Sequence, residues 1–260
     1  MNLGKRVRLN RIFAHPSGRL CSVAVDHFIG YQAGLPEGLR DLPAALRLLV
    51  EAGPDAVTMH KGVALGCWEP YAGKVPLILQ TIIGRPDDSA DDSLATPEDA
   101  VRLGADAVAT AAFVRGPTEA AHLRRAADAV RAAEAWEMPV VLHVYPRSYR
   151  GDKVEVSFEP EDIAWAVRCA IESGVDIIKV PYCGDVKSYS QIVRGCPVPI
   201  VAAGGPKTKT LDDALQLAGE VVASGASGMT IGRNVWGVSD PGKALAAFKK
   251  IIHSKVGSRP

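Results

Sequence analysis

The stretch that decides the fold of this chain is Ser173-Gly174-Val175-Asp176-Ile177-Ile178-Lys179-Val180-Pro181. It joins the end of an expected helix to a short apolar strand through a glycine. Glycine suits the left-handed position after a helix, because a side chain there would clash with the backbone. The same joint occurs three more times, at Glu51-Ala52-Gly53-Pro54-Asp55, Leu103-Gly104-Ala105-Asp106 and Ser224-Gly225-Ala226-Ser227. Four such joints indicate a parallel α/β fold, in which helices lead repeatedly back into strands.

Strand and helix candidates alternate along the chain. Eight short apolar runs are predicted as strands, over residues 20–25, 56–59, 76–81, 107–111, 140–144, 175–180, 200–203 and 228–231. Helices are predicted over residues 42–51, 97–103, 118–137, 160–173, 189–194, 211–224 and 241–252, with the weakest pattern over residues 62–73. Eight strands favour one (β/α)8 TIM barrel domain over residues 1–260, with a short N-terminal segment before strand one. The alternative is an open doubly wound sheet, which usually carries GxGxxG where this chain has Val25-Asp26-His27.

Composition narrows the class of protein. The chain has 260 residues, 47% of them hydrophobic, which is enough for one sizeable core. The net charge of +1 favours neither nucleic acid nor an anionic membrane surface as a partner. We expect no membrane span, because no apolar run approaches the required length of about 20 residues. The five cysteines are scattered without a CxxC pair, which indicates reduced thiols in a cytoplasmic protein.

Lys179 is the strongest candidate for chemistry. It lies near the end of an apolar strand, and burial disfavours a charged amine and lowers its pKa. A free lysine titrates at roughly 10.4 and is a poor nucleophile at neutral pH. A neutral amine can attack a carbonyl and form a Schiff base. The alternative is a lysine that reaches solvent from the strand end or pairs with a carboxylate.

Other polar residues follow the predicted strands at the barrel end where active sites are built. They are Asp26, His27, Lys61, Tyr145, Arg147 and Arg233. The turns Ala203-Gly204-Gly205 and Gly232-Arg233-Asn234 come after strands seven and eight, where barrels commonly bind phosphate through backbone N–H groups. Polar residues gather at strand ends in any barrel, because loops lie on the surface. The two glycine turns in this pair of strands are the more specific sign, and they predict a phosphate site.

Acid–base chemistry has two candidates. Tyr145 follows an apolar strand, where a tyrosine is often a core residue with a satisfied hydroxyl, but opposite Lys179 it could carry a proton. Asp26 could do the same or orient a substrate hydroxyl. His27, His60 and His143 would suggest a metal, but each comes from a different strand with no i, i+4 pair. We therefore expect no metal and no cofactor.

Ordered motifs along nearly the whole chain resemble the archaeal-type class I fructose-bisphosphate aldolases and their transaldolase-like relatives. The motifs are the opening segment Gly4-Lys5-Arg6-Val7-Arg8-Leu9-Asn10-Arg11-Ile12-Phe13, then Val25-Asp26-His27, Met59-His60-Lys61-Gly62, Tyr145-Pro146-Arg147, Ile177-Ile178-Lys179-Val180, Ala203-Gly204-Gly205-Pro206-Lys207 and Ile231-Gly232-Arg233-Asn234-Val235-Trp236. The resemblance implies a metal-independent lyase of carbohydrate metabolism, such as glycolysis, that acts on a phosphorylated sugar. It also implies a homo-oligomer, a pentamer or decamer.

The resemblance assigns a role to each site residue. Lys179 would form the Schiff base and Tyr145 would transfer the proton, with Asp26 near the substrate hydroxyls. Substrate binding is expected from His27, Lys61, Arg147, Gly204, Gly205, Gly232 and Arg233. The family usually has glycine after Asp-His, whereas this chain has Phe28-Ile29-Gly30-Tyr31, and the segment 147–156 looks polar and long. Both differences border the expected substrate mouth.

Three functions remain in competition. The leading one is a class I aldolase that cleaves or forms a C–C bond in a phosphorylated ketose such as fructose 1,6-bisphosphate, with a dihydroxyacetone phosphate-like donor. The second is a transaldolase-like or thiolase-like transferase that uses the same imine. The third is a non-catalytic phosphosugar-binding protein, against which the presence of both Tyr145 and Lys179 argues. The sequence leaves the ketose, its aldehyde and the direction of flux open.

Overall fold

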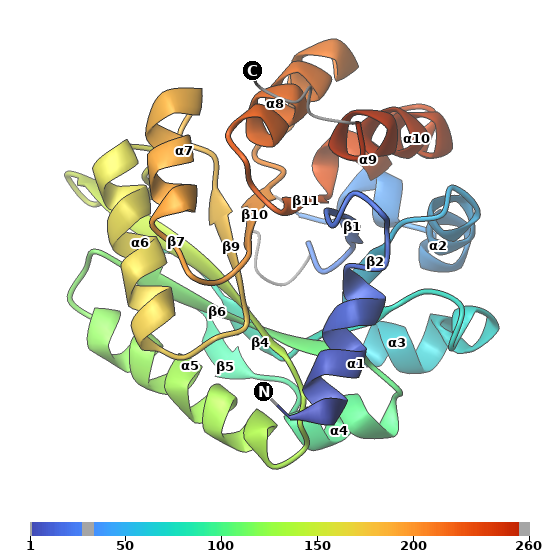
Figure 1. Cartoon of the computed structure of the whole chain (residues 1–260), viewed down its shortest axis with the longest axis horizontal. Helices are drawn as coiled ribbons and strands as arrows, with labels where there is room; N and C mark the ends of the chain where they lie inside the picture. Colours follow the sequence, from blue (N-terminus) through green and yellow to red (C-terminus); the bar gives the residue numbers. More distant parts are fainter. Residues whose placement is uncertain (1, 28–33, 255–260) are drawn as a thin grey trace.

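Eight parallel strands close into a barrel in the computed structural model, which describes residues 2–27 and 34–254 (Figure 1). The barrel strands are β1 (Leu20–Ala24), β2 (Ala56–His60), β3 (Leu77–Gln80), β6 (Ala107–Val114), β7 (Val140–Arg150), β9 (Ile177–Pro181), β10 (Ile200–Ala203) and β11 (Gly228–Ile231). They are hydrogen-bonded in the order β6-β3-β2-β1-β11-β10-β9-β7, and the β6–β7 pairing closes the ring. The predicted (β/α)8 barrel and all eight predicted strands are confirmed.

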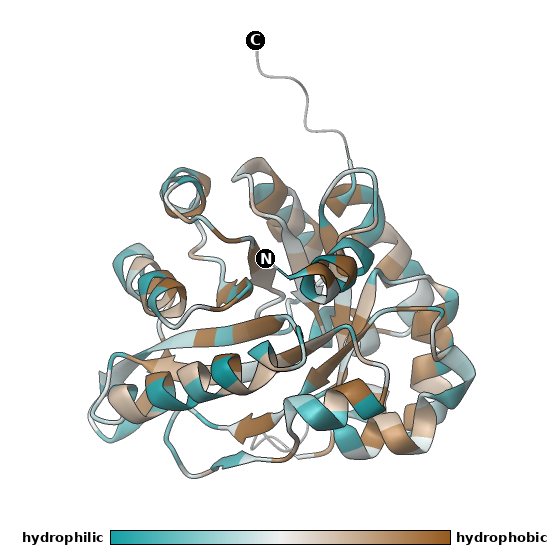
Figure 2. Cartoon of the chain, turned by 60° about the horizontal axis from the view of Figure 1, so that its bottom comes forward, coloured by the Kyte–Doolittle hydropathy of each residue, from teal (hydrophilic) through white to brown (hydrophobic). Residues whose placement is uncertain are grey.

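Helices form the outer ring of the barrel. They are α2 (Leu42–Glu51), α3 (Lys61–Cys67), α4 (Pro97–Arg102), α5 (Glu119–Glu134), α6 (Pro160–Glu172), α7 (Val186–Arg194), α8 (Leu211–Ala223), α9 (Arg233–Trp236) and α10 (Pro241–Ile252). Two short 3-10 helices cover Glu37–Leu39 and Glu69–Tyr71. Figure 2 shows largely hydrophobic strands, whereas the helices carry both hydrophobic and hydrophilic residues. The helices therefore bury one face on the barrel and expose the other. In the described parts of the chain, no helix is long and apolar enough to cross a membrane.

The four glycine joints have the conformation that the sequence predicts. Gly53, Gly104, Gly174 and Gly225 have φ angles of 70°, 67°, 78° and 88°. The aspartate after the glycine has a role of its own in two joints, since its carboxylate accepts a hydrogen bond from the first residues of a neighbouring strand. The Cys21 amide donates to Asp55 Oδ2 at 2.6 Å, and the Val140 amide donates to Asp176 Oδ2 at 2.9 Å. Each joint thus ends a helix, and two of them also anchor an adjacent strand.

A helix that the sequence did not predict closes the N-terminal end of the barrel. This helix, α1 (Leu3–Ile12), lies across the bottom of the strands (Figure 1). Its last residue, Ile12, is fully buried in an interior cluster with Leu20, Ala56, Ile78, Ala107, Ala109, Val141, Ile177 and Val201. The cluster fills the lower half of the barrel and leaves the upper half for polar side chains.

Two hairpins stand at the C-terminal end of the barrel. One joins β4 (Ile82–Gly84) to β5 (Asp91–Ser93). The other joins the far half of β7 to β8 (Lys153–Val156), with Arg147 paired to Val156. The fifth strand, predicted over residues 140–144, is therefore longer than predicted, because antiparallel pairing with β8 extends it to Arg150. Residues 28–33, which include Phe28, lie outside the described residues.

Candidate active site

Strand alternation carries a row of polar side chains into the upper half of the barrel. Successive side chains of a strand face opposite sides, so residues two apart share a face. Ile177 and Val141 belong to the interior cluster, which places Lys179 and His143 above them on the same face. The two strands are in register, with His143 directly beside Lys179. A lysine and a histidine thus meet inside the barrel.

Lys179 is buried, with 5% of its surface exposed. Burial lowers the pKa of its amine below the usual range, the nearby Asp26 carboxylate raises it, and the Arg233 cation lowers it further. The net direction is down. A larger fraction of the amine is therefore neutral at physiological pH than in a free lysine, which is the condition for attack on a carbonyl.

Asp26 is held by partners on both carboxylate oxygens. Its Oδ1 lies 3.2 Å from His27 Nδ1, and its Oδ2 accepts a hydrogen bond from Gln80 Nε2 at 3.1 Å. Burial raises the pKa of Asp26, but the hydrogen bond to His27 and the positive charge of Lys179 outweigh this effect and hold the pKa well below its usual range. Asp26 is therefore an anion beside Lys179.

Gln80 sets the protonation of His143. The Thr81 amide donates to Gln80 Oε1 at 3.1 Å, so the other end of the Gln80 amide is the donor. That NH2 group lies 3.2 Å from His143 Nδ1, which must accept and leaves the ring proton on Nε2. Burial and the nearby Lys179 lower the pKa of His143 well below its usual value, although Asp26 raises it. His143 is a neutral imidazole that presents an N–H.

Two cavities meet at Lys179. The hairpin lobe, of about 300 Å³, lies toward the β4–β5 hairpin and includes Ile82, Arg85, Asp87 and Phe113 in its lining. The glycine lobe, of about 360 Å³, lies toward the turns after β10 and β11. Four residues line both lobes: His27, Tyr145, Val156 and Lys179. The amine can therefore reach a molecule that extends into both.

Close approach of two turns builds the glycine lobe. A Cβ on Gly204 would lie 2.9 Å from Ile231 Cα, and a Cβ on Gly232 would lie 2.5 Å from His27 Cε1. Gly205 has a φ of 67°. The buried Asn234 joins the turns, since its Nδ2 donates to Gly204 O at 3.1 Å and its Oδ1 accepts from the Thr208 amide at 2.9 Å. This packing exposes backbone to the lobe where side chains would otherwise block it.

Arg233, from α9, and Tyr145, from β7, both line the glycine lobe. Arg233 begins α9, lines the glycine lobe, and donates from Nη2 to Gly205 O at 2.9 Å. Tyr145 lies one interior position above His143 on β7, and its ring stacks on Phe113 with centroids 5.7 Å apart. Tyr145 and Lys179 both line the two lobes.

Two of the predicted substrate-binding residues lie elsewhere. Lys61 begins α3 and its Nζ donates to Asp99 Oδ1 at 2.7 Å, and it is outside the described linings of both lobes. Arg147 is also outside them, with 3% of its surface exposed, because its side chain turns toward Asp88. The structure brings the other predicted residues together: Asp26, His27, Tyr145, Lys179, Gly204, Gly205, Gly232 and Arg233.

Sequence reasoning gave no site role to Gln80, His143, His60 or Arg85, all of which line the hairpin lobe. The signal for Gln80 and His143 was present in the alternation, since each lies two residues after an interior residue, Ile78 or Val141. Within residues 2–27 and 34–254, no group of three or more His, Cys, Asp or Glu side chains could hold a metal ion.

A closed (β/α)8 barrel with a lysine of lowered pKa inside its C-terminal end is the arrangement of a Schiff-base aldolase. The sequence profile of DeoC/LacD family aldolases matches residues 20–237, and the chain belongs to this family.

Individual relatives match along almost their whole length. The fructose-bisphosphate aldolase class 1 of Thermoproteus tenax is 36% identical over 94% of this chain and 92% of its own. The 2-amino-4,5-dihydroxy-6-oxo-7-(phosphonooxy)heptanoate synthase of Streptomyces griseus is 28% identical over 96% of this chain and 90% of its own. One solved structure superposes on this chain with a TM-score of 0.83 at 33% identity, over 96% of this chain and all of that one. It is an archaeal fructose-1,6-bisphosphate aldolase with its catalytic Lys covalently bound to the carbinolamine intermediate of the substrate.

Proposed function

We propose that this aldolase cleaves or forms the C–C bond of a phosphorylated ketose through a Schiff base on Lys179. The observation that carries the proposal is the position of Lys179, buried where the two lobes meet. A donor such as dihydroxyacetone phosphate would place its phosphate at the backbone of Gly204, Gly205 and Gly232 and at the guanidinium of Arg233. Its carbonyl would then lie at the amine, and the aldehyde acceptor would occupy the hairpin lobe.

The reaction follows from these positions. The Lys179 amine adds to the C2 carbonyl of the ketose, and loss of water leaves a protonated imine. A base takes the proton of the C4 hydroxyl, the C3–C4 bond breaks, and its electron pair moves to the imine nitrogen as the aldehyde leaves. Protonation of the enamine at C3 and hydrolysis release the second product and restore the amine.

Three groups would handle the protons. Tyr145, which lines both lobes, is the candidate for the C4 hydroxyl. Asp26 is an anion beside Lys179; it would stabilise the cationic imine and accept a hydrogen bond from a substrate hydroxyl. The neutral His143 presents an N–H beside Lys179 and would donate to the oxygen that leaves as water.

A second candidate is a synthase that joins a similar donor to an acceptor of different chemistry. Named relatives favour it, because the product in the Streptomyces griseus name also carries a ketone next to a phosphorylated carbon. The lining of the hairpin lobe includes the apolar Ile82, Ile83 and Phe113, and the hairpin turn adds the cation Arg85 and the anion Asp87. This lining would suit an aldehyde with an apolar stretch and an anionic end. The two candidate functions therefore differ in the aldehyde that the hairpin lobe accepts.

Borohydride trapping tests the shared step of both candidates. The protein is reduced in the presence of dihydroxyacetone phosphate, and mass spectrometry of its peptides locates the adduct. We expect modification at Lys179 in the wild type and none in Lys179→Met, while Lys187→Met, which removes an exposed lysine on α7, traps like the wild type. An unmodified wild type, or equal trapping in Lys179→Met, contradicts the proposal. Turnover on a panel of phosphorylated ketoses, with and without added aldehydes, then separates cleavage from transfer.

The oligomeric state, the cellular location and the metabolic role of the enzyme are also proposals. We infer a homo-oligomer, because the outer surface exposes 43% of Trp136 and 42% of Trp165, and tryptophan is enriched at protein interfaces. All five cysteines are free, which supports a reducing, cytoplasmic location. A role in carbohydrate metabolism, such as glycolysis, would follow if fructose 1,6-bisphosphate is the best substrate of the panel. Light scattering during gel filtration measures the oligomer.

A further inference from the structure

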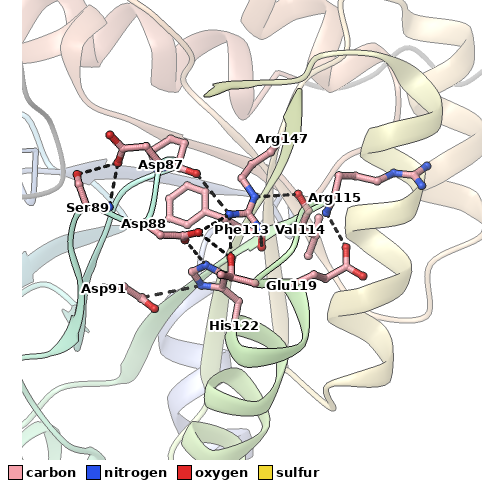
Figure 3. Close-up of polar contacts among 12 residues, drawn as sticks. Asp87, Asp88, Ser89, Asp91, Phe113, Val114, Arg115, Glu119, His122 and Arg147 are labelled. Atoms are coloured by element: carbon pink, nitrogen blue, oxygen red, sulfur yellow. Dashed lines mark hydrogen bonds and ion pairs between the residues drawn. The ribbon is translucent and has the colours of Figure 1, made fainter. Parts of the chain in front are cut away.

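The wall of the hairpin lobe is attached to a buried polar network. Arg85, Pro86 and Asp87, in the turn of the β4–β5 hairpin, line the lobe. The next residue, Asp88, points the other way, between the hairpin, α5 and β7 (Figure 3). Asp88 has a φ of 59°, in the left-handed region that non-glycine residues seldom adopt. Such a conformation persists where surrounding contacts hold it.

Three side chains hold the Asp88 carboxylate. Thr118 Oγ1 donates to Oδ2 at 2.7 Å, Arg147 Nη1 donates to the same oxygen at 3.0 Å, and His122 Nε2 lies 2.8 Å from Oδ1 (Figure 3). Burial raises the pKa of Asp88, but the bonds to Thr118 and His122 and the charge of Arg147 lower it below its usual value overall. An anion with partners from α5 and β7 therefore anchors the turn that forms the lobe wall.

Arg147 donates hydrogen bonds to the backbone of two residues that line the hairpin lobe. Its Nη1 reaches Pro86 O at 3.4 Å, and its Nη2 donates to Phe113 O at 3.1 Å. Both Pro86 and Phe113 line the lobe, and the ring of Phe113 stacks on Tyr145. One guanidinium thus links the hairpin turn to the backbone of β6, whose Phe113 also lines the lobe.

His122 gives the hairpin a second attachment. It is fully buried on α5, and Arg125 Nη2 lies 2.6 Å from its Nδ1. Because that nitrogen accepts, Nε2 carries the proton that is donated to Asp88. The same Arg125 nitrogen lies 2.5 Å from Asp91 on β5, so the turn and β5 are both tied to α5.

We propose that the network of Arg147, Asp88 and His122, with Thr118, positions the β4–β5 hairpin and thereby determines which aldehyde the hairpin lobe accepts. These are positioning residues, since they touch the backs of the residues that line the lobe. The inference rests on the proposed function, because it assumes that the acceptor occupies this lobe and the donor the other. It also explains why Arg147, which follows Tyr145 so closely, turns away from the substrate.

A purely stabilising role would not need this chemistry. Burying the Arg147 guanidinium costs desolvation, even though 29% of the Asp88 side chain is exposed, and apolar side chains often stabilise a fold as well or better. The guanidinium offers five donors in a planar fork, which can bind a carboxylate and backbone carbonyls of separate elements at defined angles. The arrangement therefore specifies position, and an error of about 1 Å at a reacting group can cost about a hundredfold in rate.

Asp88→Asn tests the proposal, since asparagine keeps the size and tolerates the left-handed conformation but leaves Arg147 without its anion. Thr118→Val is the milder variant, because it removes one donor to Asp88 and keeps the side-chain shape. The control is Asp176→Asn at the opposite end of the barrel, where Asp176 pairs with Lys5 at 3.1 Å. Each protein is assayed for synthesis with dihydroxyacetone phosphate and the aldehyde that the wild type uses best, for borohydride trapping with dihydroxyacetone phosphate alone, and for thermal stability.

For Asp88→Asn we expect the KM for the aldehyde to rise about ten- to a hundredfold, with donor trapping within about twofold of the wild type. Thr118→Val should show a smaller change of the same kind, and the ranking of alternative aldehydes should shift in both. Asp176→Asn should lose stability without a change in the aldehyde KM or in donor trapping. Equal changes in donor trapping and aldehyde KM, or none in Asp88→Asn and Thr118→Val, overturn the inference. A wild type that does not trap dihydroxyacetone phosphate contradicts the proposed function instead.

Discussion

At the scale of single residues, Lys179 is placed where its amine is both desolvated and surrounded by charge. Burial and Arg233 lower its pKa, whereas Asp26 raises it. The two neighbours therefore act on the same amine in opposite directions, and each can be removed separately. The balance between them sets the pH at which the nucleophile becomes neutral.

We predict opposite pH shifts for two variants. The rate of imine formation should rise with pH as the Lys179 amine loses its proton. Arg233→Met removes a cation that lowers this pKa, so the rising limb should move to higher pH. Asp26→Asn removes an anion that raises it, so the limb should move to lower pH. Borohydride trapping of dihydroxyacetone, which has no phosphate for Arg233 to bind, measured across pH, checks this. Shifts in the same direction would contradict it.

The proposed role of Tyr145 is the one that a single substitution tests most directly. If its phenol carries the proton, Tyr145→Phe should still form the imine but stall at C–C cleavage, with turnover lower by about 10²–10⁴-fold. The ring stacking on Phe113 is kept, so a packing defect would not explain the loss. Trapping and steady-state cleavage are measured on the same preparation. Turnover within a few-fold of the wild type would make Tyr145 a packing residue and leave Asp26 as the proton carrier.

At the scale of elements, the glycine lobe depends on how closely the turns after β10 and β11 approach each other and His27. We predict that Gly232→Ala raises the KM for phosphorylated ketoses, because the new Cβ would lie 2.5 Å from the His27 ring. Trapping of unphosphorylated dihydroxyacetone should change much less. The matched control is Gly219→Ala on α8, where a Cβ meets nothing within 4 Å. The control should keep both activities and gain about 0.5–1 kcal/mol of helix stability, measured by urea unfolding. An equal loss of activity in the control would point to a general effect of added methyl groups and contradict the prediction.

The two hairpins at the C-terminal end of the barrel line different parts of the cavities. The β7–β8 hairpin contributes Val156 to both lobes, and the β4–β5 hairpin contributes the wall of one. Neither hairpin is part of the barrel sheet's parallel repeat. The substrate lobes can therefore vary between family members without a change in the strands that hold Lys179.

At the scale of the whole molecule, the two ends of the barrel separate stability from chemistry. The lower half is filled by apolar side chains under α1, and the polar site occupies the upper half. We predict that Ile12→Ala lowers the free energy of unfolding by about 2–5 kcal/mol, because it leaves a cavity in the sealed end. KM and turnover of the folded enzyme should stay unchanged. Val7→Ala on the same helix, at 40% exposed, is the control and should cost far less. A change in KM for Ile12→Ala would show that the ends are coupled.

The sequence by itself determined the repeating frame of this protein. The four glycine joints and eight apolar runs are local signals, and each is decided by the conformational freedom of one glycine or by a few neighbouring side chains. The burial of Lys179 and the pair of glycine turns also follow from such runs, because alternation along a strand fixes which residues face inward. These features required no knowledge of distant contacts.

The tertiary structure alone decided where the polar side chains beyond the strand ends would turn. Arg147 looked like a substrate ligand, but Asp88, 59 residues away in the chain, lies behind the cavity wall and pairs with it. Lys61 turned to Asp99 in the same way, and Gln80 came to join Asp26 to His143. A charged side chain at a strand end can satisfy itself with a substrate or with a protein partner. Which of these occurs depends on pairings that only the closed barrel and its hairpins bring within hydrogen-bond distance.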